Sequence, residues 1–248
     1  MNTEYDVIET VTVYGGAGTQ FGGLPLGESA IYNFSGIWNY DGFSPSRSKN
    51  IKAGARYTEG DWAFDGNLFY NKIDDSHDLT GTVVGSTVIR NSTIDLVTKG
   101  YNLSSTYNYG PGFARLTYSH TDVETNGGAP LSTNASYQGV LQGDMFSLEI
   151  GHSWDDLGLR VGSTSELALS NDDPEKNGFP KLDTYFVTNL YGEWTPASLS
   201  AVTLRVDALN ILDRDYIDRT TPGYDSSQVG EPYHEPGRTF LVSAKVAF

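Results

Sequence analysis

The C-terminal end of the chain alternates regularly between apolar and polar side chains. Apolar side chains stand at every second position, namely Phe240, Val242, Ala244, Val246 and Phe248. The opposite face carries Thr239, Ser243 and Lys245. Because successive side chains of a β-strand point to opposite faces, this period predicts a strand with one apolar side.

The same alternation recurs along most of residues 48–248. It is clearest at 51–57, 101–109, 115–118, 145–154 and 202–208, and weaker at 62–72, 158–169 and 185–194. Most of these segments approach the roughly 10 residues that a tilted strand needs to cross a membrane. Together with the C-terminal segment they predict about nine strands.

The connections between these segments alternate in length. Short ones fall at 58–61, 110–112, 155–157 and 196–200, and long ones at 76–97, 123–144, 170–184 and 212–238. A soluble sandwich has no reason to keep its short connections at one end. Bacterial membrane barrels have short periplasmic turns and long extracellular loops, so the alternation favours a barrel.

Aromatic side chains flank the expected short turns. They are Tyr57, Trp62, Tyr109, Phe113, Trp154 and Trp194. Such residues form a girdle at the membrane interface, although ordinary packing between strands would also use them. Their positions agree with short turns at one edge of a membrane.

Residues 1–47 are less regular. Segments 7–14 and 31–40 each have the composition of a strand, and a Gly-rich stretch at 15–27 separates them. We expect one or two strands and a loop here, with no helix.

Composition excludes several classes of protein. The 248 residues carry a net charge of −15 and no cluster of Lys or Arg, which argues against a nucleic-acid partner. No Cys is present, so a disulfide framework or thiolate metal site is excluded. No stretch of about 18 apolar residues predicts a membrane helix, but a barrel strand does not need one. No signal peptide is visible at 1–9, so we expect either a soluble chain or a missing N-terminus.

Four segments carry a specific sequence pattern. "PSRSKNIKAGARY" (45–57) is followed by "NLFYNKIDD" (67–75), and "RVDALNILDRDY" (205–216) precedes "EPGRTFLVSAKVAF" (235–248). In this order they resemble a mid-barrel strand pair, the penultimate strand and the last strand of the TonB-dependent outer-membrane receptors. That family imports ferric siderophores, haem or cobalamin. The matching motif residues are Asn210, Asp213, Tyr216, Pro236, Gly237 and Arg238, while Ile211-Leu212 replaces the family's Leu-Phe.

The resemblance implies an all-β fold of antiparallel transmembrane β-barrel strands. It implies a partial barrel, about 9 to 11 strands of a family barrel of about 22. Residues 48–248 would be its C-terminal portion, in the outer membrane of a Gram-negative bacterium. The family's plug domain is absent from the sequence, so TonB would act only through a missing plug and the chain would be a truncated or partial receptor. The segment at 8–13, IETVTV, weakly resembles a TonB box, but an ordinary strand or loop is the preferred interpretation.

The last strand has a second expected use. An alternating strand that ends in an aromatic residue can be captured by strand addition at a sheet edge. The resemblance implies that the outer-membrane assembly machinery recognises this segment. The expected contacts are Phe240, Val242, Val246 and Phe248, which would also face lipid.

Ligand recognition is expected in the long loops. The last loop offers four candidates for contact with an iron chelate such as a ferric siderophore or haem: Arg219, Tyr224, Tyr233 and His234. Ordinary solvated loop residues are the alternative. No cofactor or resident metal is expected.

Two other functions remain open at this stage. An outer-membrane barrel enzyme of protease or lipase type would need a cluster of His, Ser and acidic residues, but no Gly-x-Ser-x-Gly, His-Glu-x-x-His or P-loop motif occurs. We therefore predict no catalytic residue. A soluble secreted all-β binding module would require the apolar faces to pack on each other.

Overall fold

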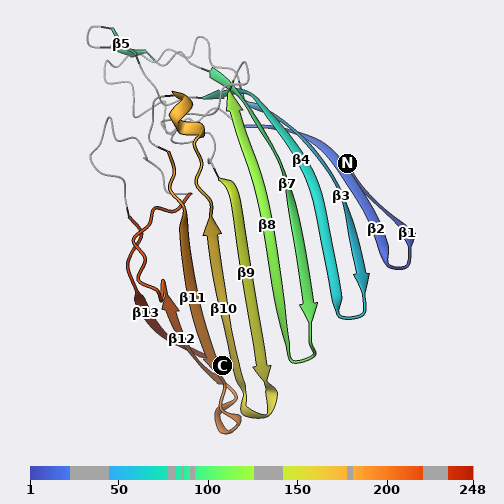
Figure 1. Cartoon of the computed structure of the whole chain (residues 1–248), viewed down its shortest axis with the longest axis vertical. Coiled ribbons are helices and arrows are strands. Elements are labelled where there is room, and N and C mark those ends of the chain that lie inside the picture. The colour runs from blue at the N-terminus through green and yellow to red at the C-terminus, as the bar shows by residue number, and fades with distance from the viewer. Residues whose placement is uncertain are drawn as a thin grey trace.

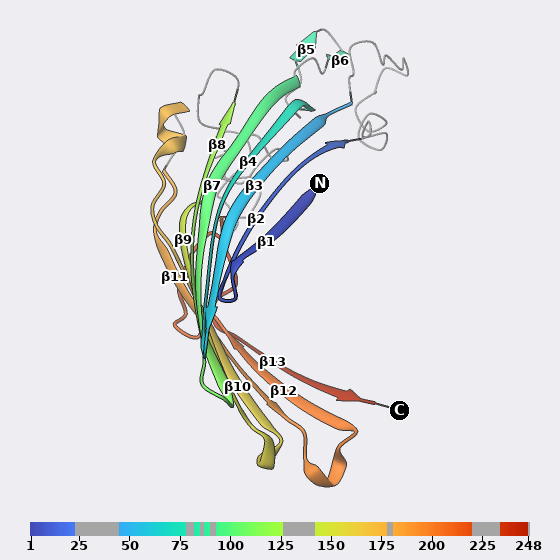
Figure 2. The same ribbon diagram turned by 90° about the vertical axis from the view of Figure 1, so that its right-hand side faces the viewer.

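The fold is a single layer of β-sheet. The computed structural model describes residues 1–22, 45–77, 82–84, 87–89, 93–125, 142–177, 181–219 and 234–247. These form an 11-stranded sheet and a separate hairpin of two short strands, β5 (Thr82–Val84) and β6 (Thr87–Ile89). Figures 1 and 2 show the large sheet as one curved layer, and no other described element forms a second layer against it. The expected all-β, antiparallel fold is confirmed.

The strands of the large sheet lie side by side in chain order, each antiparallel to its neighbour. They are β1 (Asn2–Ile8), β2 (Val11–Phe21), β3 (Arg47–Glu59), β4 (Trp62–His77), β7 (Thr93–Asn108), β8 (Gly112–Thr125), β9 (Gly143–Trp154), β10 (Leu159–Ala168), β11 (Tyr185–Trp194), β12 (Val202–Leu209) and β13 (Thr239–Val246). Three short 3₁₀ helices lie in the connections: η1 (Asp155–Leu157), η2 (Asp173–Asn177) and η3 (Ala197–Leu199). No helix in the described part of the chain is long and apolar enough to span a bilayer.

The short turns gather at one end of the sheet (Figure 1). They join β1 to β2, β3 to β4, β7 to β8, β9 to β10 and β11 to β12. The long connections lie at the opposite end, as the sequence predicts. The turn at Gly60, between β3 and β4, has φ +56, a left-handed conformation that glycine adopts without steric cost.

The register divides the sheet into an apolar face and a polar face. On the apolar face Leu116 lies opposite Leu148, and Val206 lies opposite Val242. On the polar face Arg115 lies opposite Glu149. Since directly opposed residues share a face, this alternation extends across all 11 strands.

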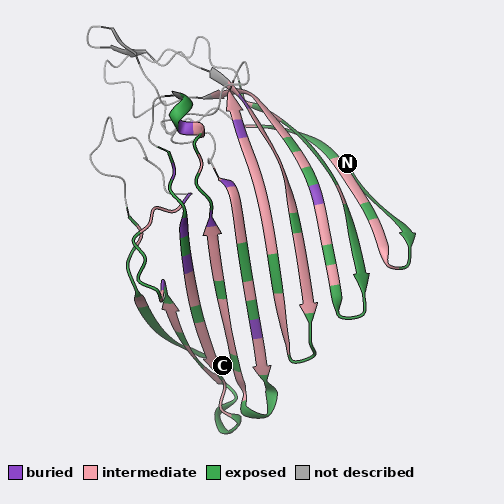
Figure 3. Cartoon of the chain, in the orientation of Figure 1, coloured by how far each residue is buried: buried purple, intermediate pink, exposed green. Residues whose placement is uncertain are grey.

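Among the described residues, no element packs on the apolar face. Leu68 is 65% exposed and Val242 is 77% exposed. Figure 3 shows exposed positions along every strand. Within the described residues only seven apolar side chains are buried: Leu96, Val123, Ala168, Pro174, Leu182, Tyr185 and Val187. An apolar surface of this extent requires an apolar environment, and lipid provides it. The soluble-module alternative, which needs these rows packed on each other, is therefore wrong.

Aromatic residues gather on the apolar face near the short turns. The ring of Trp62 stacks on Phe64 with centroids 5.6 Å apart and lies 4.6 Å from the ring of Tyr107. The ring centroids of Trp154 and His152 are 4.2 Å apart. Phe113 was expected in the same girdle, but it lies opposite Gly151 on the polar face. The girdle therefore consists of residues from the apolar rows.

Several strand boundaries differ from the prediction. Residues 7–14 are not one strand, because a turn at Glu9 and Thr10 separates β1 from β2. The Gly-rich stretch is partly strand, since β2 runs on to Phe21. A Cβ on Gly16 would come within 2.1 Å of Oδ1 of the exposed Asn2, so the Asn2 side chain would have to move to admit any other residue. Segment 31–40 lies outside the described residues.

The loop predicted at 76–97 overlaps both neighbouring strands, because β4 continues to His77 and β7 begins at Thr93. Strands β4 and β7 extend beyond the apolar rows, with polar side chains continuing the ladder. There Lys49 and Lys72 both bind Asp74, which gives these polar segments cross-strand contacts in place of apolar packing. Alternation of apolar residues cannot reveal a strand whose outer side is charged.

The two edges of the sheet run in the same direction. Every neighbouring pair is antiparallel and the sheet has 11 strands, so β1 and β13 are parallel to each other. Bacterial barrels have an even number of antiparallel strands. Closing this sheet on itself, or joining two copies with their loops on one side, would create parallel seams. A second sheet that completes a barrel with these 11 strands, without a parallel seam, must itself have an odd number of strands.

We therefore expect residues 1–248, produced alone behind an export signal, to yield little folded barrel. Both edge strands would keep unpaired backbone groups, which cannot be satisfied in lipid. The measurement is the mobility of outer-membrane fractions on denaturing gels with and without heating. An even-stranded bacterial barrel exported in the same way is the positive control, and a heat-modifiable band from the chain alone would show that the edges can pair in parallel.

Candidate ligand-binding site

The polar face carries a network of ion pairs near the short turns. Arg205 donates to Glu193 at 2.8 Å and to Asp207 at 2.5 Å, and its guanidinium lies 4.5 Å from the ring centre of Tyr191. Arg160 approaches the same Glu193 at 3.7 Å. In a membrane barrel the apolar face meets lipid and the polar face lines the interior. These charges therefore make the interior wall hydrophilic.

The N-terminal strands continue this interior wall. The Tyr14 hydroxyl donates to Asp65 at 2.8 Å, and Arg56 lies 3.6 Å from the same carboxylate. Asn102 donates to Asn67 at 3.2 Å across β7 and β4. These contacts are partly exposed, so they contribute polarity and orientation more than stability.

The base of the long connection between β12 and β13 is organised around Asn210. This buried residue has φ +47, which asparagine tolerates better than most residues. Its side-chain amide donates to the carbonyl oxygens of Arg214 at 2.8 Å and Pro236 at 3.2 Å, and its side-chain oxygen accepts from the Arg214 N–H at 2.9 Å. One side chain therefore holds both ends of the connection together.

Asp213 makes the second link at this base. Its Oδ1 accepts the backbone N–H of Arg238 at 2.8 Å. A Cβ on Gly237 would lie 2.9 Å from the same oxygen, so glycine permits the close approach. The six motif residues thus come together in space at the two ends of one loop, and their geometry accounts for the pattern in structural terms. The sequence predicted the residues but not this convergence.

A small packed cluster lies just above this base, where β10 and β11 meet the long connections. The Tyr185 hydroxyl donates to Glu166 at 2.5 Å, and its ring lies 4.8 Å from that of Tyr216. Ala168 and Val187 complete the cluster. Tyr185 and Glu166 were not predicted, although alternation along β11 places Tyr185 on the polar face next to a loop.

Tyr216 is the member of this cluster that lies outside the strands. Burial raises the pKa of its phenol, and the nearby carboxylates of Glu235 and Asp218 raise it further. The hydroxyl therefore stays protonated at physiological pH. A neutral phenol can stack on an aromatic ligand and donate a hydrogen bond.

The predicted ligand contacts fall in different environments. Arg219 is 8% exposed and donates to the carbonyl oxygens of Leu169 at 2.7 Å and Asp183 at 2.8 Å. It thereby ties three loop segments together. His234 is exposed, with its Nδ1 2.5 Å from Asp215. Tyr224, Tyr233 and the terminal Phe248 lie outside the described residues, and the ligand role of all four candidates stays a prediction.

The sequence matches a family model over most of its length. Residues 2–211 match the model described as "TonB dependent receptor-like, beta-barrel". The chain belongs to this family. Membership identifies it as part of a non-enzymatic transporter family of the Gram-negative outer membrane. This family assignment replaces the alternative of a barrel enzyme of protease or lipase type.

Individual relatives extend the comparison. The haem transporter BhuA of Brucella ovis is 26% identical over 249 residues, covering 98% of this chain and 37% of the relative. Among solved structures, the copper transporter OprC has a TM-score of 0.77 at 16% identity, covering 100% of this chain and 40% of that one. The FrpB iron transporter from Neisseria meningitidis has a TM-score of 0.74 at 16% identity, covering 99% and 38%. These structural similarities show a shared fold, and the chain spans less than half of each relative.

We expect Asn210→Ala to loosen the loop base by about 1–3 kcal/mol, because it removes three hydrogen bonds and leaves buried groups unpaired. Hydrogen exchange of the peptide at 210–216, measured in the full protein, should accelerate about tenfold or more. Asn50→Ala, at an exposed asparagine whose side chain contacts Ser48, is the matched control and should leave exchange unchanged. Equal exchange in the two variants would exclude Asn210 as the organiser of the base.

Proposed function

We propose that this chain is the C-terminal part of the barrel wall of a TonB-dependent transporter that imports an iron chelate such as a ferric siderophore or haem. The observation that carries the proposal is the family match over residues 2–211 on a sheet whose apolar face has no protein cover. In this proposal residues 48–248 supply the last strands of the barrel. TonB acts on a plug domain contributed by sequence outside these residues.

The substrate class rests on two supports. The curated relatives that align with 98% of the chain are named haem transporters, and one structural relative is an iron transporter. The long connection between β12 and β13 also contains Tyr216 and His234, and an aromatic ring and an imidazole can stack on or ligate a chelate. Tyr224, Tyr233 and Arg219 belong to the same proposed loop.

The last strand has its own proposed role. Phe240 and Val242 on β13 are strongly exposed along the apolar face, and Val246 continues the same row. We propose that this row, ending at Phe248, is recognised by the outer-membrane assembly machinery through strand addition and then faces lipid.

Deleting the codons for residues 1–248 from the native gene should abolish uptake of one iron chelate. Uptake of radiolabelled iron would be measured from haem and from ferric siderophores, and uptake of copper ions would be measured in parallel. The deletion removes half the wall of the barrel, so no gated transport should remain. Restoring the intact gene on a plasmid is the control.

Loss of copper uptake with every iron chelate still imported would overturn the proposed substrate class. A narrower variant, His234→Ala with Tyr216→Phe, tests the loop. It should weaken chelate binding by about tenfold if these side chains contact the ligand. Lys176→Ala, in η2, is a loop control that should leave binding unchanged.

A further inference from the structure

Arg219 joins the last long connection to the long connection before it. Its side chain, in the β12–β13 connection, is buried. The Nη2 atom donates to the carbonyl oxygens of Leu169 at 2.7 Å and Asp183 at 2.8 Å. Leu169 directly follows β10, and Asp183 lies shortly before the start of β11. One nitrogen atom therefore binds both ends of the β10–β11 connection.

The two ends of the β10–β11 connection form a paired neck, which we define as residues 169–171 and 182–184. Asn171 and Leu182 exchange two backbone hydrogen bonds, at 2.9 and 2.8 Å. The backbone N–H of Ser170 donates to the hydroxyl of Thr184 at 2.9 Å. Because the neck is closed by its own hydrogen bonds, Arg219 binds a segment whose two chains already move together.

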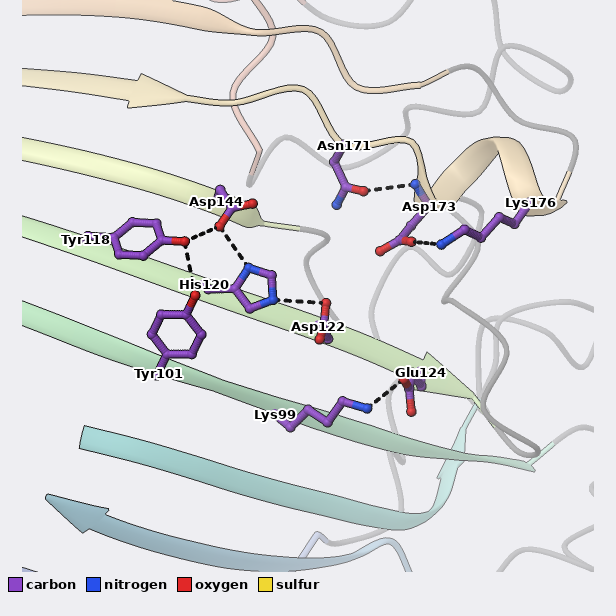
Figure 4. A network of polar contacts seen from close by, with 10 residues as sticks. All are labelled: Lys99, Tyr101, Tyr118, His120, Asp122, Glu124, Asp144, Asn171, Asp173 and Lys176. Carbon is purple, nitrogen blue, oxygen red and sulfur yellow. Dashed lines mark hydrogen bonds and ion pairs between the residues drawn. The ribbon is translucent and has the colours of Figure 1, made fainter. Parts of the chain in front are cut away.

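The neck also contacts the base of a third long connection. The backbone N–H of Leu169 donates to the carbonyl oxygen of Asp144, at the start of β9, at 2.9 Å. The Asp144 carboxylate accepts the Tyr118 hydroxyl at 2.5 Å and lies 2.8 Å from Nδ1 of His120, both on β8 (Figure 4). A continuous row of contacts therefore runs from Arg219 through the neck to β9 and β8.

The position of Tyr216 depends on the same contacts. Its ring lies 4.8 Å from that of Tyr185, the first residue of β11. Tyr185 is buried, and its hydroxyl donates to Glu166 on β10 at 2.5 Å. The guanidinium carbon of Arg219 lies 5.4 Å from the centre of the Tyr185 ring. Since Tyr216 and Arg219 pack on one ring from one short segment, releasing Arg219 would free the segment that carries Tyr216.

We propose that Arg219 is a positioning residue, which joins the β10–β11 and β12–β13 connections into one unit and so holds Tyr216 in place for the chelate. The proposal rests on the proposed function, in which Tyr216 contacts the chelate. A loop that is already ordered binds more tightly, because the ligand does not have to order it. Both Nη2 hydrogens are used by carbonyl oxygens, so Arg219 acts through the loops in place of the direct ligand contact expected from the sequence.

The test uses the full outer-membrane protein in detergent and begins without ligand. Arg219→Gln removes the bonds to the two carbonyl oxygens. Arg214→Gln is the matched control, because it makes the same charge change at an exposed residue of the same connection. Hydrogen exchange of the peptide at 169–177 should accelerate about tenfold or more in Arg219→Gln and stay unchanged in Arg214→Gln. Equal exchange in the two variants would overturn the proposal.

Arg219→Lys tests for rescue by a conservative change. It keeps the charge and the N–H donors on a shorter side chain, so its exchange at 169–177 should fall between those of the wild type and Arg219→Gln. It also takes the place of Arg219→Gln if that variant does not fold. Exchange in Arg219→Lys as slow as in the wild type, with Arg219→Gln also unchanged, would show that these bonds do not hold the neck.

The second stage measures binding of two probes, haem and a ferric catecholate siderophore. The probe that the wild type binds should slow exchange at 169–177. Arg219→Gln should bind it about tenfold more weakly, by the same factor at about 0.05 M and about 0.5 M salt, because the loss is one of loop order and not of charge. In this variant the bound probe should no longer slow exchange at 169–177, whereas Arg214→Gln should behave as the wild type.

Three outcomes of the second stage are decisive. Wild-type affinity in Arg219→Gln would overturn the proposal, since the arginine would then only stabilise the loops. A loss of affinity that disappears at high salt would identify a direct charge contact with the ligand and would also overturn it. If the wild type binds neither probe, the proposed substrate class fails, and exchange in the ligand-free variants still decides whether Arg219 joins the two connections.

Discussion

The structure depends on one constraint, which is that a single layer of strands exposes a complete apolar face and has almost no core of its own. Backbone groups are satisfied only by lateral pairing, and the apolar side chains are satisfied only by lipid. Both conditions hold together in a barrel wall. The short turns lie at one end of the sheet, and the strand ends that the longer connections join lie at the other.

The same constraint determines where function is located. Since one face is given to lipid, charged and hydrogen-bonding groups gather on the other face and in the long connections. The motif residues Asn210, Asp213, Pro236, Gly237 and Arg238 contact one another across the two ends of the last connection. They close the base of the last connection, and so fix the starting points from which its outer residues project.

Much of the fold could be predicted because alternation is strong where lipid lies on one side. Phe146, Leu148 and Ile150, with Ser147 and Glu149 between them, predict β9 without any long-range information. The prediction failed where apolar and polar residues no longer alternate. Gly16 has no side chain, so it adds nothing to the alternation that marks a strand. Lys72 and Asp74 continue β4 beyond the apolar row, but their charged side chains hide this extension from a search for apolar positions. The convergence of Asn210 with Pro236 depends on pairing between distant segments, which no local pattern encodes.

Because the sequence contains no Cys, single cysteines can be introduced without background, and a spin-label scan along β9 from Phe146 to Ile150 tests the central claim most directly. In the full protein in bilayers, labels at Phe146, Leu148 and Ile150 should be accessible to oxygen dissolved in lipid, and labels at Ser147 and Glu149 to a water-soluble relaxation agent. A scan in which accessibility shows no period of two, or in which Leu148 is shielded from lipid, would contradict the account.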